Sequence, residues 1–308
     1  MKLRPSFLLL IFLAVAASVA AVASQAFGFN YIDLGHVAKA IVHRHDVLMV
    51  GNSVIQGVSK CDDDERSIAE MTSSALAAPV LDFSRGGMQL HEELALIRSS
   101  VMGQNGRVIV LPLAVADQLL AARAPTVGRQ AWLGHLTKKA MPPPPAAPTT
   151  YKGIRYGTYP EFSAKYFTVE KASTQCPEVR VSNPDFVTFM YWLNFARHDD
   201  YASGQAELIE QFKAIQASGN ILVVAIFPYN WKMVADHFGQ EAVAKIDRHV
   251  AQVRATLGDH GIRVVDLSKA LAPTDFTDIW CACGHLNQHG RMTVAQSLAG
   301  EIKAASSP

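Results

Sequence analysis

Short runs of apolar residues alternate along this chain with segments of helical periodicity. The apolar runs have the length of strands and lie at residues 47–50, 80–83, 107–113, 221–227 and 263–266. The clearest helical patterns are at residues 89–102, 205–217, 240–257 and 293–305. An acidic run at 62–65 predicts the start of a further helix, because carboxylates are favourable at the positive end of the helix dipole. This alternation predicts an α/β fold with about five parallel strands, right-handed crossovers and helices on both faces.

The α/β rhythm weakens from about residue 118 to residue 201. This segment includes a proline cluster at 142–148, which favours extended conformations and cannot join a helix. Aromatic residues follow the cluster, and they can either form a wall of a binding cleft or pack locally. We therefore expect a single domain over residues 24–308, with an irregular, lid-like insertion at about 118–201 after the third strand.

The N-terminus has the build of an export signal. Lys2 and Arg4 precede an apolar run at residues 7–17, and the small-x-small sequence Ala21-Val22-Ala23 follows. Residues 1–23 are predicted to be a signal peptide, or a membrane anchor if they are not cleaved, since the segment is just long enough to span a bilayer. Either interpretation places the body of the protein in the periplasm or outside the cell.

Export would allow the four cysteines to form disulfides. Cys61, Cys176, Cys281 and Cys283 are an even set, and two disulfides are expected in an oxidising compartment, with the pairing left open. A zinc site is the alternative, although Cys-x-Cys is not the usual spacing of structural zinc ligands.

The charge balance argues against a nucleic-acid partner. The chain has 28 lysines and arginines against 27 aspartates and glutamates, and no basic stripe with interleaved aromatic residues is seen. Small, neutral or polymeric ligands fit this balance better.

Two stretches carry candidate chemistry. Ser53 follows the first strand in a Gly51-Asn52-Ser53 turn, which places its hydroxyl at the edge of the sheet where parallel α/β folds bind ligands. His285 lies on a loop before the last helix, from which it can reach that serine, while the upstream Asp278 orients its other nitrogen. These residues are candidates for nucleophile, base and acid; the alternatives are an ordinary turn and a surface loop that contains histidines by chance.

Three blocks resemble the SGNH (GDSL-type) hydrolases. They are Gly51-Asn52-Ser53, Arg85-Gly86-Gly87, and Asp278 with His285-Leu286-Asn287-x-x-Gly290. The resemblance runs from about residue 46 to 303 without the insertion, and it implies a three-layer, flavodoxin-like fold. It also implies that Ser53 is the nucleophile and an oxyanion donor, that His285 is the base, and that the N–H of Gly87, or of Gly86 one position earlier, is a second donor.

The blocks depart from the family pattern in three places. Asn52 replaces an aspartate that mainly supports the turn. Ala116 stands where a third oxyanion donor, an asparagine, is expected, and Asn194 and Asn230 are the alternatives for it.

The third departure concerns the acid. Ala282 stands three residues before His285, where the family has its aspartate, so Asp278, Asp275 or a backbone carbonyl would have to orient the histidine. His289 is expected only to be exposed.

The resemblance implies a serine esterase or acyltransferase that needs no metal or organic cofactor. Export and an aromatic-containing insertion favour O-acetyl groups of a cell-envelope carbohydrate as substrate, and a secreted esterase of lipids or small esters is the other catalytic option. The competing class is an inactive carbohydrate-binding or assembly protein of the envelope on the same fold. Reaction of Ser53 with a fluorophosphonate separates the catalytic class from the inactive one.

Overall fold

The computed structural model describes the parts of the chain that form the predicted sheet. These are residues 46–56, 62–84, 88, 90–101, 105–113, 150–151, 154–155, 202–277 and 285–306. Residues 1–23, most of the predicted insertion and all four cysteines lie outside these ranges, so the expectations for them stay predictions. Among the helices in the described ranges, none combines the length and apolar character that crossing a membrane requires.

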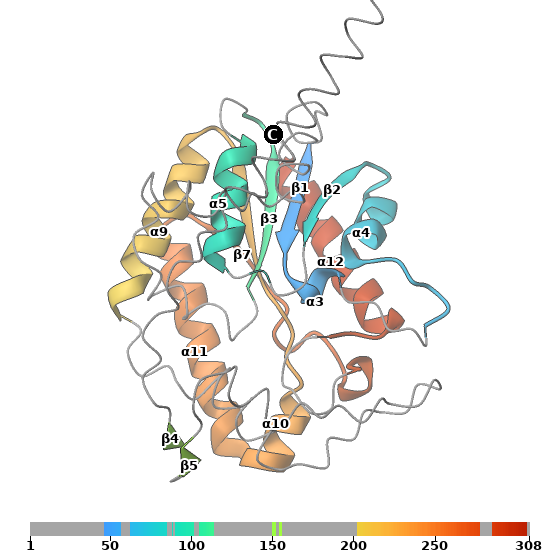
Figure 1. Cartoon of the computed structure of the whole chain (residues 1–308), viewed down its shortest axis with the longest axis vertical. Coiled ribbons are helices and arrows are strands. Elements are labelled where there is room, and N and C mark those ends of the chain that lie inside the picture. The colour runs from blue at the N-terminus through green and yellow to red at the C-terminus, as the bar shows by residue number, and fades with distance from the viewer. Residues whose placement is uncertain are drawn as a thin grey trace, which may run out of the picture.

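Five parallel strands form one sheet in the order β2-β1-β3-β6-β7 (Figure 1). The strands are β1 (Val47–Gly51), β2 (Val80–Ser84), β3 (Val108–Leu113), β6 (Ile221–Ile226) and β7 (Arg263–Asp266). Because the chain goes from β1 outward to β2 and then returns past β1 to β3, the carboxyl ends of β1 and β3 flank a topological switch point, where such sheets bind ligands. The predicted α/β fold with five parallel strands is confirmed.

Helices cover both faces of the sheet because successive strand residues point to opposite sides. In β1, Leu48 and Val50 pack in one core with α5 (Leu90–Val101), α9 (Ala202–Ala217), α10 (Trp231–Phe238) and α11 (Gln240–Asp259). Val47 and Met49 pack in a second core with α3 (Ser53–Gln56), α4 (Ile68–Leu76) and α12 (Gln288–Ser306). Burial on both faces explains why the central strands β1, β3 and β6 read as continuous apolar runs.

Three helices begin more than two residues from their predicted starts, and one of them is α9, which begins at Ala202 and not at 205. The acidic run at 62–65 lies before α4, which begins only after Ser67; the Ser67 hydroxyl and the Glu70 carboxylate form a capping box there. The last helix begins at Gln288, five residues before the predicted start at 293. In the region of the predicted insertion, β4 (Thr150–Tyr151) pairs antiparallel with β5 (Ile154–Arg155).

Candidate catalytic site

The turn that carries Ser53 depends on a close approach at Gly51, the last residue of β1. A Cβ atom at position 51 would lie 2.6 Å from Cγ1 of Ile55 and 2.8 Å from Cγ of Pro112. Only glycine therefore allows α3 to begin immediately above the end of β1 and beside β3. This packing places Ser53 at the carboxyl edge of the sheet, as the sequence predicts.

Asn52 organises the start of α3. Its side-chain Oδ1 accepts a hydrogen bond from the N–H of Val54 at 3.0 Å, and its carbonyl accepts from the N–H groups of Ile55 and Gln56. The side chain thus supports the turn. The neutral amide oxygen of Asn52 accepts this hydrogen bond as the carboxylate oxygen of an aspartate would. These bonds use the N–H groups that follow Ser53 and not that of Ser53 itself, which opens the helix.

The structure brings Ser53 and His285 together. Nε2 of His285 lies 3.0 Å from Oγ of Ser53, although the two residues are 232 positions apart in the sequence. The loop of His285 is held by a single antiparallel bridge between Phe276 and Leu286 and by a hydrogen bond from the Thr277 N–H to the His285 carbonyl. Ser53 and His285 are both partly exposed, so solvent reaches the pair.

The sequence His-Leu-Asn-x-x-Gly serves to place this loop on the first turn of α12. Oδ1 of Asn287 accepts from the N–H of Gly290 at 3.0 Å, which caps the helix, and Nδ2 of Asn287 donates to the carbonyl of Thr274 at 2.8 Å. Gly290 lies against η4 (Pro273–Asp275), where an added Cβ would be 2.8 Å from the Asp275 carbonyl oxygen. Gly290 is the third residue of α12 and not part of the loop before the helix.

Asp275 is occupied by neighbours other than His285. Its Oδ1 lies 2.8 Å from Nδ1 of His289, its Oδ2 accepts from the N–H of Ala272, and its carbonyl accepts from the N–H of Asn287. The carboxylate is buried, whereas the side chain of His289 is 77% exposed. His289 is thus exposed as expected, but its pairing with Asp275 was not foreseen from the sequence.

Several candidate residues lie outside the described ranges. They are Asp278, Gly86, Gly87, Ala116, Asn194 and Ala282. The roles assigned to them stay predictions. Asn230 is described: it caps α10, where its Oδ1 accepts from the N–H of Met233 at 3.1 Å, so its side-chain oxygen has a structural task.

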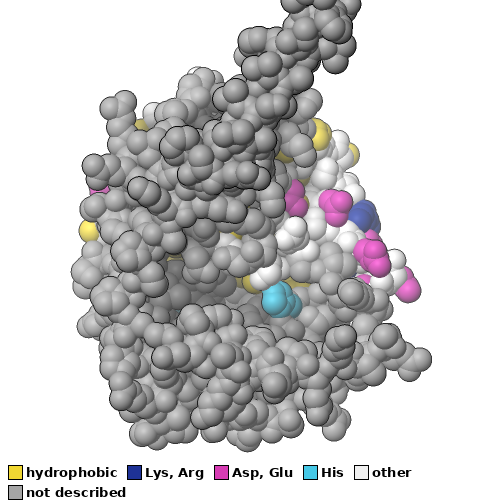
Figure 2. All heavy atoms as spheres, viewed as in Figure 1, with side chains coloured by type: hydrophobic (Ala, Val, Ile, Leu, Met, Phe, Trp, Pro, Cys, Tyr) yellow, Lys and Arg dark blue, Asp and Glu magenta, His cyan; other side chains and the backbone are white. Residues whose placement is uncertain are grey.

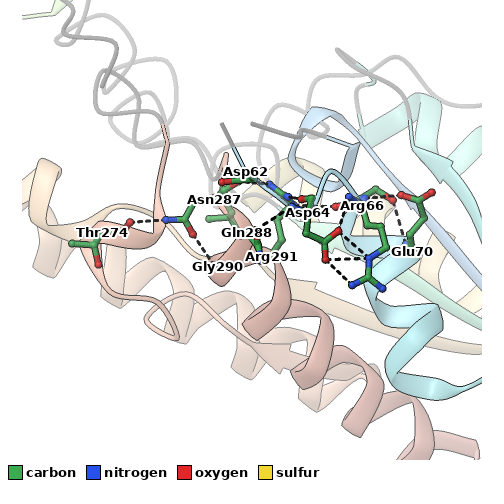
Figure 3. A network of polar contacts seen from close by, with 11 residues as sticks. Asp62, Asp64, Arg66, Glu70, Thr274, Asn287, Gln288, Gly290 and Arg291 are labelled. Carbon is green, nitrogen blue, oxygen red and sulfur yellow. Dashed lines mark hydrogen bonds and ion pairs between the residues drawn. The ribbon is translucent and has the colours of Figure 1, made fainter. Parts of the chain in front are cut away.

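A polar network joins the start of α12 to the segment before α4 (Figure 3). It centres on Arg291, whose guanidinium contacts Asp62 and backbone carbonyls, and it includes the ion pair between Asp64 and Arg66. Hydrogen bonds from Arg66 lower the pKa of Asp64 from 3.8 to about 2, and the carboxylate in turn raises the pKa of Arg66. Sequence reasoning missed Arg291, although it follows directly after the Gly290 of the motif.

The described surface shows where charge and histidine are exposed. In Figure 2, acidic side chains with a basic one among them lie on the side of the molecule occupied by α4 in Figure 1, and a histidine reaches the surface near α3. Within the described ranges, no group of three or more histidine, cysteine or carboxylate side chains is arranged to hold a metal ion.

Comparison with known proteins yields distant structural similarity. No family model and no curated relative matches the chain. Similar solved structures include a lipolytic protein of the G-D-S-L family from Veillonella parvula, at 11% identity and TM-score 0.42, covering 82% of this chain and 94% of that one.

Two further similar structures are an extracellular lipase and a carbohydrate acetylesterase. The lipase is from Streptomyces rimosus, at 13% identity and TM-score 0.42, covering 85% of this chain and 99% of that one. The acetylesterase is from Sinorhizobium meliloti, at 10% identity and TM-score 0.41, with coverages of 85% and 99%. Similarity at this level does not assign a family or an activity to the chain.

Proposed function

We propose that this protein is an SGNH-type serine esterase or acyltransferase that acts on acyl esters through Ser53 and His285. The observation that carries the proposal is the 3.0 Å contact between Nε2 of His285 and Oγ of Ser53. A serine hydroxyl becomes a useful nucleophile only when an adjacent base can take its proton, and this distance is within the reach of such a transfer.

The chemistry follows from this contact. Oγ of Ser53 attacks the ester carbonyl while its proton passes to Nε2 of His285, and a tetrahedral oxyanion forms. The histidine then returns the proton to the leaving alcohol as the carbon–oxygen bond breaks, which leaves an acyl group on Ser53. Water, or the hydroxyl of an acceptor, completes hydrolysis or transfer by the reverse sequence.

The developing negative charge needs hydrogen-bond donors. The N–H of Ser53, the first residue of α3, is the first proposed donor, and the hydrogen bonds that Asn52 accepts come from the three N–H groups after it. The N–H of Gly87 is the second proposed donor, and Asp278 is the proposed acid that orients His285. Both of these assignments rest on the sequence blocks.

The proposed substrate is an O-acetyl group of a cell-envelope carbohydrate. Support comes from the export signal predicted at residues 1–23, which also suits a membrane tether, and from the aromatic residues of the predicted insertion, which suit stacking against sugar rings. The proposed location is accordingly the periplasm or the cell exterior.

Hydrolysis of an aryl acetate by the purified protein tests the proposed chemistry. We expect Ser53→Ala and His285→Ala each to lower turnover by roughly a thousandfold or more, and Asp278→Asn to lower it less. Ser268→Ala is the matched control, because this serine also lies beyond the carboxyl end of a strand but donates its hydroxyl to Asp266 at 2.7 Å. Undiminished turnover in Ser53→Ala would exclude that serine as the nucleophile.

A fluorophosphonate reagent separates the proposed enzyme from the inactive carbohydrate-binding alternative. The enzyme should be modified at Ser53, which mass spectrometry of the peptides identifies, and the His285→Ala variant should react much more slowly. A purely binding protein predicts no modification at this residue.

A further inference from the structure

Arg291 is a charged residue with no exposed surface. Its side chain extends from α12 into the space between this helix and the segment before α4 (Figure 3). Nη1 lies 2.6 Å from Oδ2 of Asp62 and donates to the carbonyl of Leu286 at 3.1 Å. Nε donates to the carbonyl of Arg66 at 3.0 Å, and Nη2 donates to the carbonyl of Asp64.

These contacts require a guanidinium. Burial of a charge is costly unless the charge is paired and its donors are bonded, and here one carboxylate and three carbonyls meet that requirement. The acceptors lie on different segments of the chain, and a planar fork of N–H groups can reach them at the same time. A lysine would bring a single ammonium to the same space and could satisfy only part of the set.

The contacts of Arg291 connect the two sides of the proposed catalytic pair. Leu286 is the residue directly after His285, and its side chain is buried in the core below the loop. Residues 62–66 belong to the connection that leads from α3, which begins with Ser53, to α4. Gln288 adds a second link, because its Oε1 accepts from the N–H of Asp64 at 3.1 Å.

We infer that Arg291 is a positioning residue that holds the loop of His285 against the side of the site that carries Ser53. It does not touch the reacting atoms; it fixes the carbonyl of Leu286 relative to the segment at 62–66. The inference rests on the proposed function, because a shift of this loop would lengthen the 3.0 Å contact between Nε2 of His285, the base, and Oγ of Ser53, the nucleophile.

Arg291→Met and Arg291→Lys test the inference with an aryl acetate as substrate. We expect Arg291→Met to lower kcat by about 10- to 100-fold, with KM within about twofold of wild type. The kcat of Arg291→Lys should lie between those of wild type and Arg291→Met. The rate of fluorophosphonate labelling at Ser53 should fall by the same factor as kcat. All rates are measured at a temperature where circular dichroism shows each variant to be folded.

Leu298→Ala is the matched control for stability alone. Leu298 is fully buried on the same helix and packs in the same core as Leu286, but it lies about two turns beyond Arg291. This variant should lower the unfolding midpoint while kcat and the labelling rate stay at the wild-type values. A loss of kcat in Leu298→Ala equal to that in Arg291→Met would overturn the inference, as would wild-type kcat in Arg291→Met.

Asp62→Asn covers the case in which Arg291→Met does not fold. It keeps a side-chain oxygen near Arg291 but removes the opposite charge, so we expect a smaller fall in kcat, of roughly three- to tenfold, with KM unchanged. An Asp62→Asn protein that retains full kcat would then count against the inference. Failure of the proposed function can be told apart from failure of the inference alone, because the wild-type protein would then itself lack turnover and labelling. In that case the inference would fail as well.

Discussion

Replacement of Gly290 by alanine would place a methyl group against the backbone that supports the His285 loop. The new Cβ would lie 2.8 Å from the Asp275 carbonyl oxygen and 3.2 Å from the Cβ atoms of Asp275 and Leu286. Ordinary contacts of a Cβ atom begin at 3.4 Å, so η4 and α12 would have to separate by roughly 0.6 Å at the closest point. The backbone on both sides is packed and cannot rotate away as a flexible side chain would.

The cost of this change can be estimated from two opposing effects. Overpacking of a buried contact costs about 1–3 kcal/mol, and alanine in place of glycine within a helix returns roughly 0.5–1 kcal/mol. We therefore expect Gly290→Ala to lower the free energy of unfolding by about 1–2 kcal/mol. The carbonyl of Asp275 accepts from the N–H of Asn287, two residues after His285, so kcat for an ester should also fall, on the order of tenfold.

Gly300→Ala provides the control in the same helix. Position 300 is exposed, and a Cβ there would meet no heavy atom within 4 Å. The same substitution should therefore stabilise the protein by about 0.5–1 kcal/mol and leave kcat unchanged. Urea denaturation followed by circular dichroism measures both variants. The packing argument is refuted if Gly290→Ala is as stable as wild type or if the two variants shift stability in the same direction.

Two further predictions concern the polar contacts around this helix. Asn287→Ala removes the cap on Gly290 and the bond to the Thr274 carbonyl, so it should lower the free energy of unfolding by about 1–2 kcal/mol in the same denaturation experiment. Asn287→Asp should recover part of this loss. Equal stability of the alanine variant and wild type would contradict the role of Asn287 as a cap. For Asp64, the pKa of about 2 in the folded protein lies below its ordinary 3.8, so its stabilising effect is present above about pH 4 and is lost as the pH falls through about 2. Asp64→Asn should therefore lower Tm at about pH 5 and lower it less at about pH 2.5. The fall in Tm at about pH 5 should be small, because the pair with Arg66 is at the surface. An equal fall in Tm at both pH values would be contrary to this linkage.

The sheet could be predicted from the sequence because its central strands, β1, β3 and β6, are buried on both faces. The runs at 47–50 and 221–227 coincide closely with β1 and β6, since a continuous apolar run bounded by turn residues has few other uses in an α/β chain. Parallel topology then placed Ser53 at the carboxyl edge of the sheet, within reach of a loop before the last helix.

Helix boundaries were less predictable because they depend on contacts that a sequence does not display. Gly290 was predicted to be a loop residue, but it is in the first turn of α12, where Asn287 caps the helix and η4 leaves no room for a Cβ. The short helix α10 was not predicted; the Asn230 that caps it was the available signal. The acids at 62–65 precede α4, which is capped at Ser67, and one of them, Asp62, is instead bound to Arg291.

Only part of the candidate site could be predicted, because its contacts also depend on segments that are far apart in the sequence. The sequence blocks pointed to Ser53 and His285, whereas Arg291 and the pairing of His289 with Asp275 carried no recognisable pattern. Such pairings depend on which segments the fold brings together, and neither charge spacing nor hydrophobic periodicity along the chain reports them.

The long sequence separation of the Arg291 contacts has a consequence for the timing of activity. Arg291 bonds to residues that precede it by 225 to 229 positions, and the loop of His285 lies beside it in the chain. Closure of so long a loop comes late in folding, so much of the sheet can form while the nucleophile is still without its base. On the proposed function, hydrolytic competence would therefore appear only when α12 docks and brings the loop of His285 to Ser53.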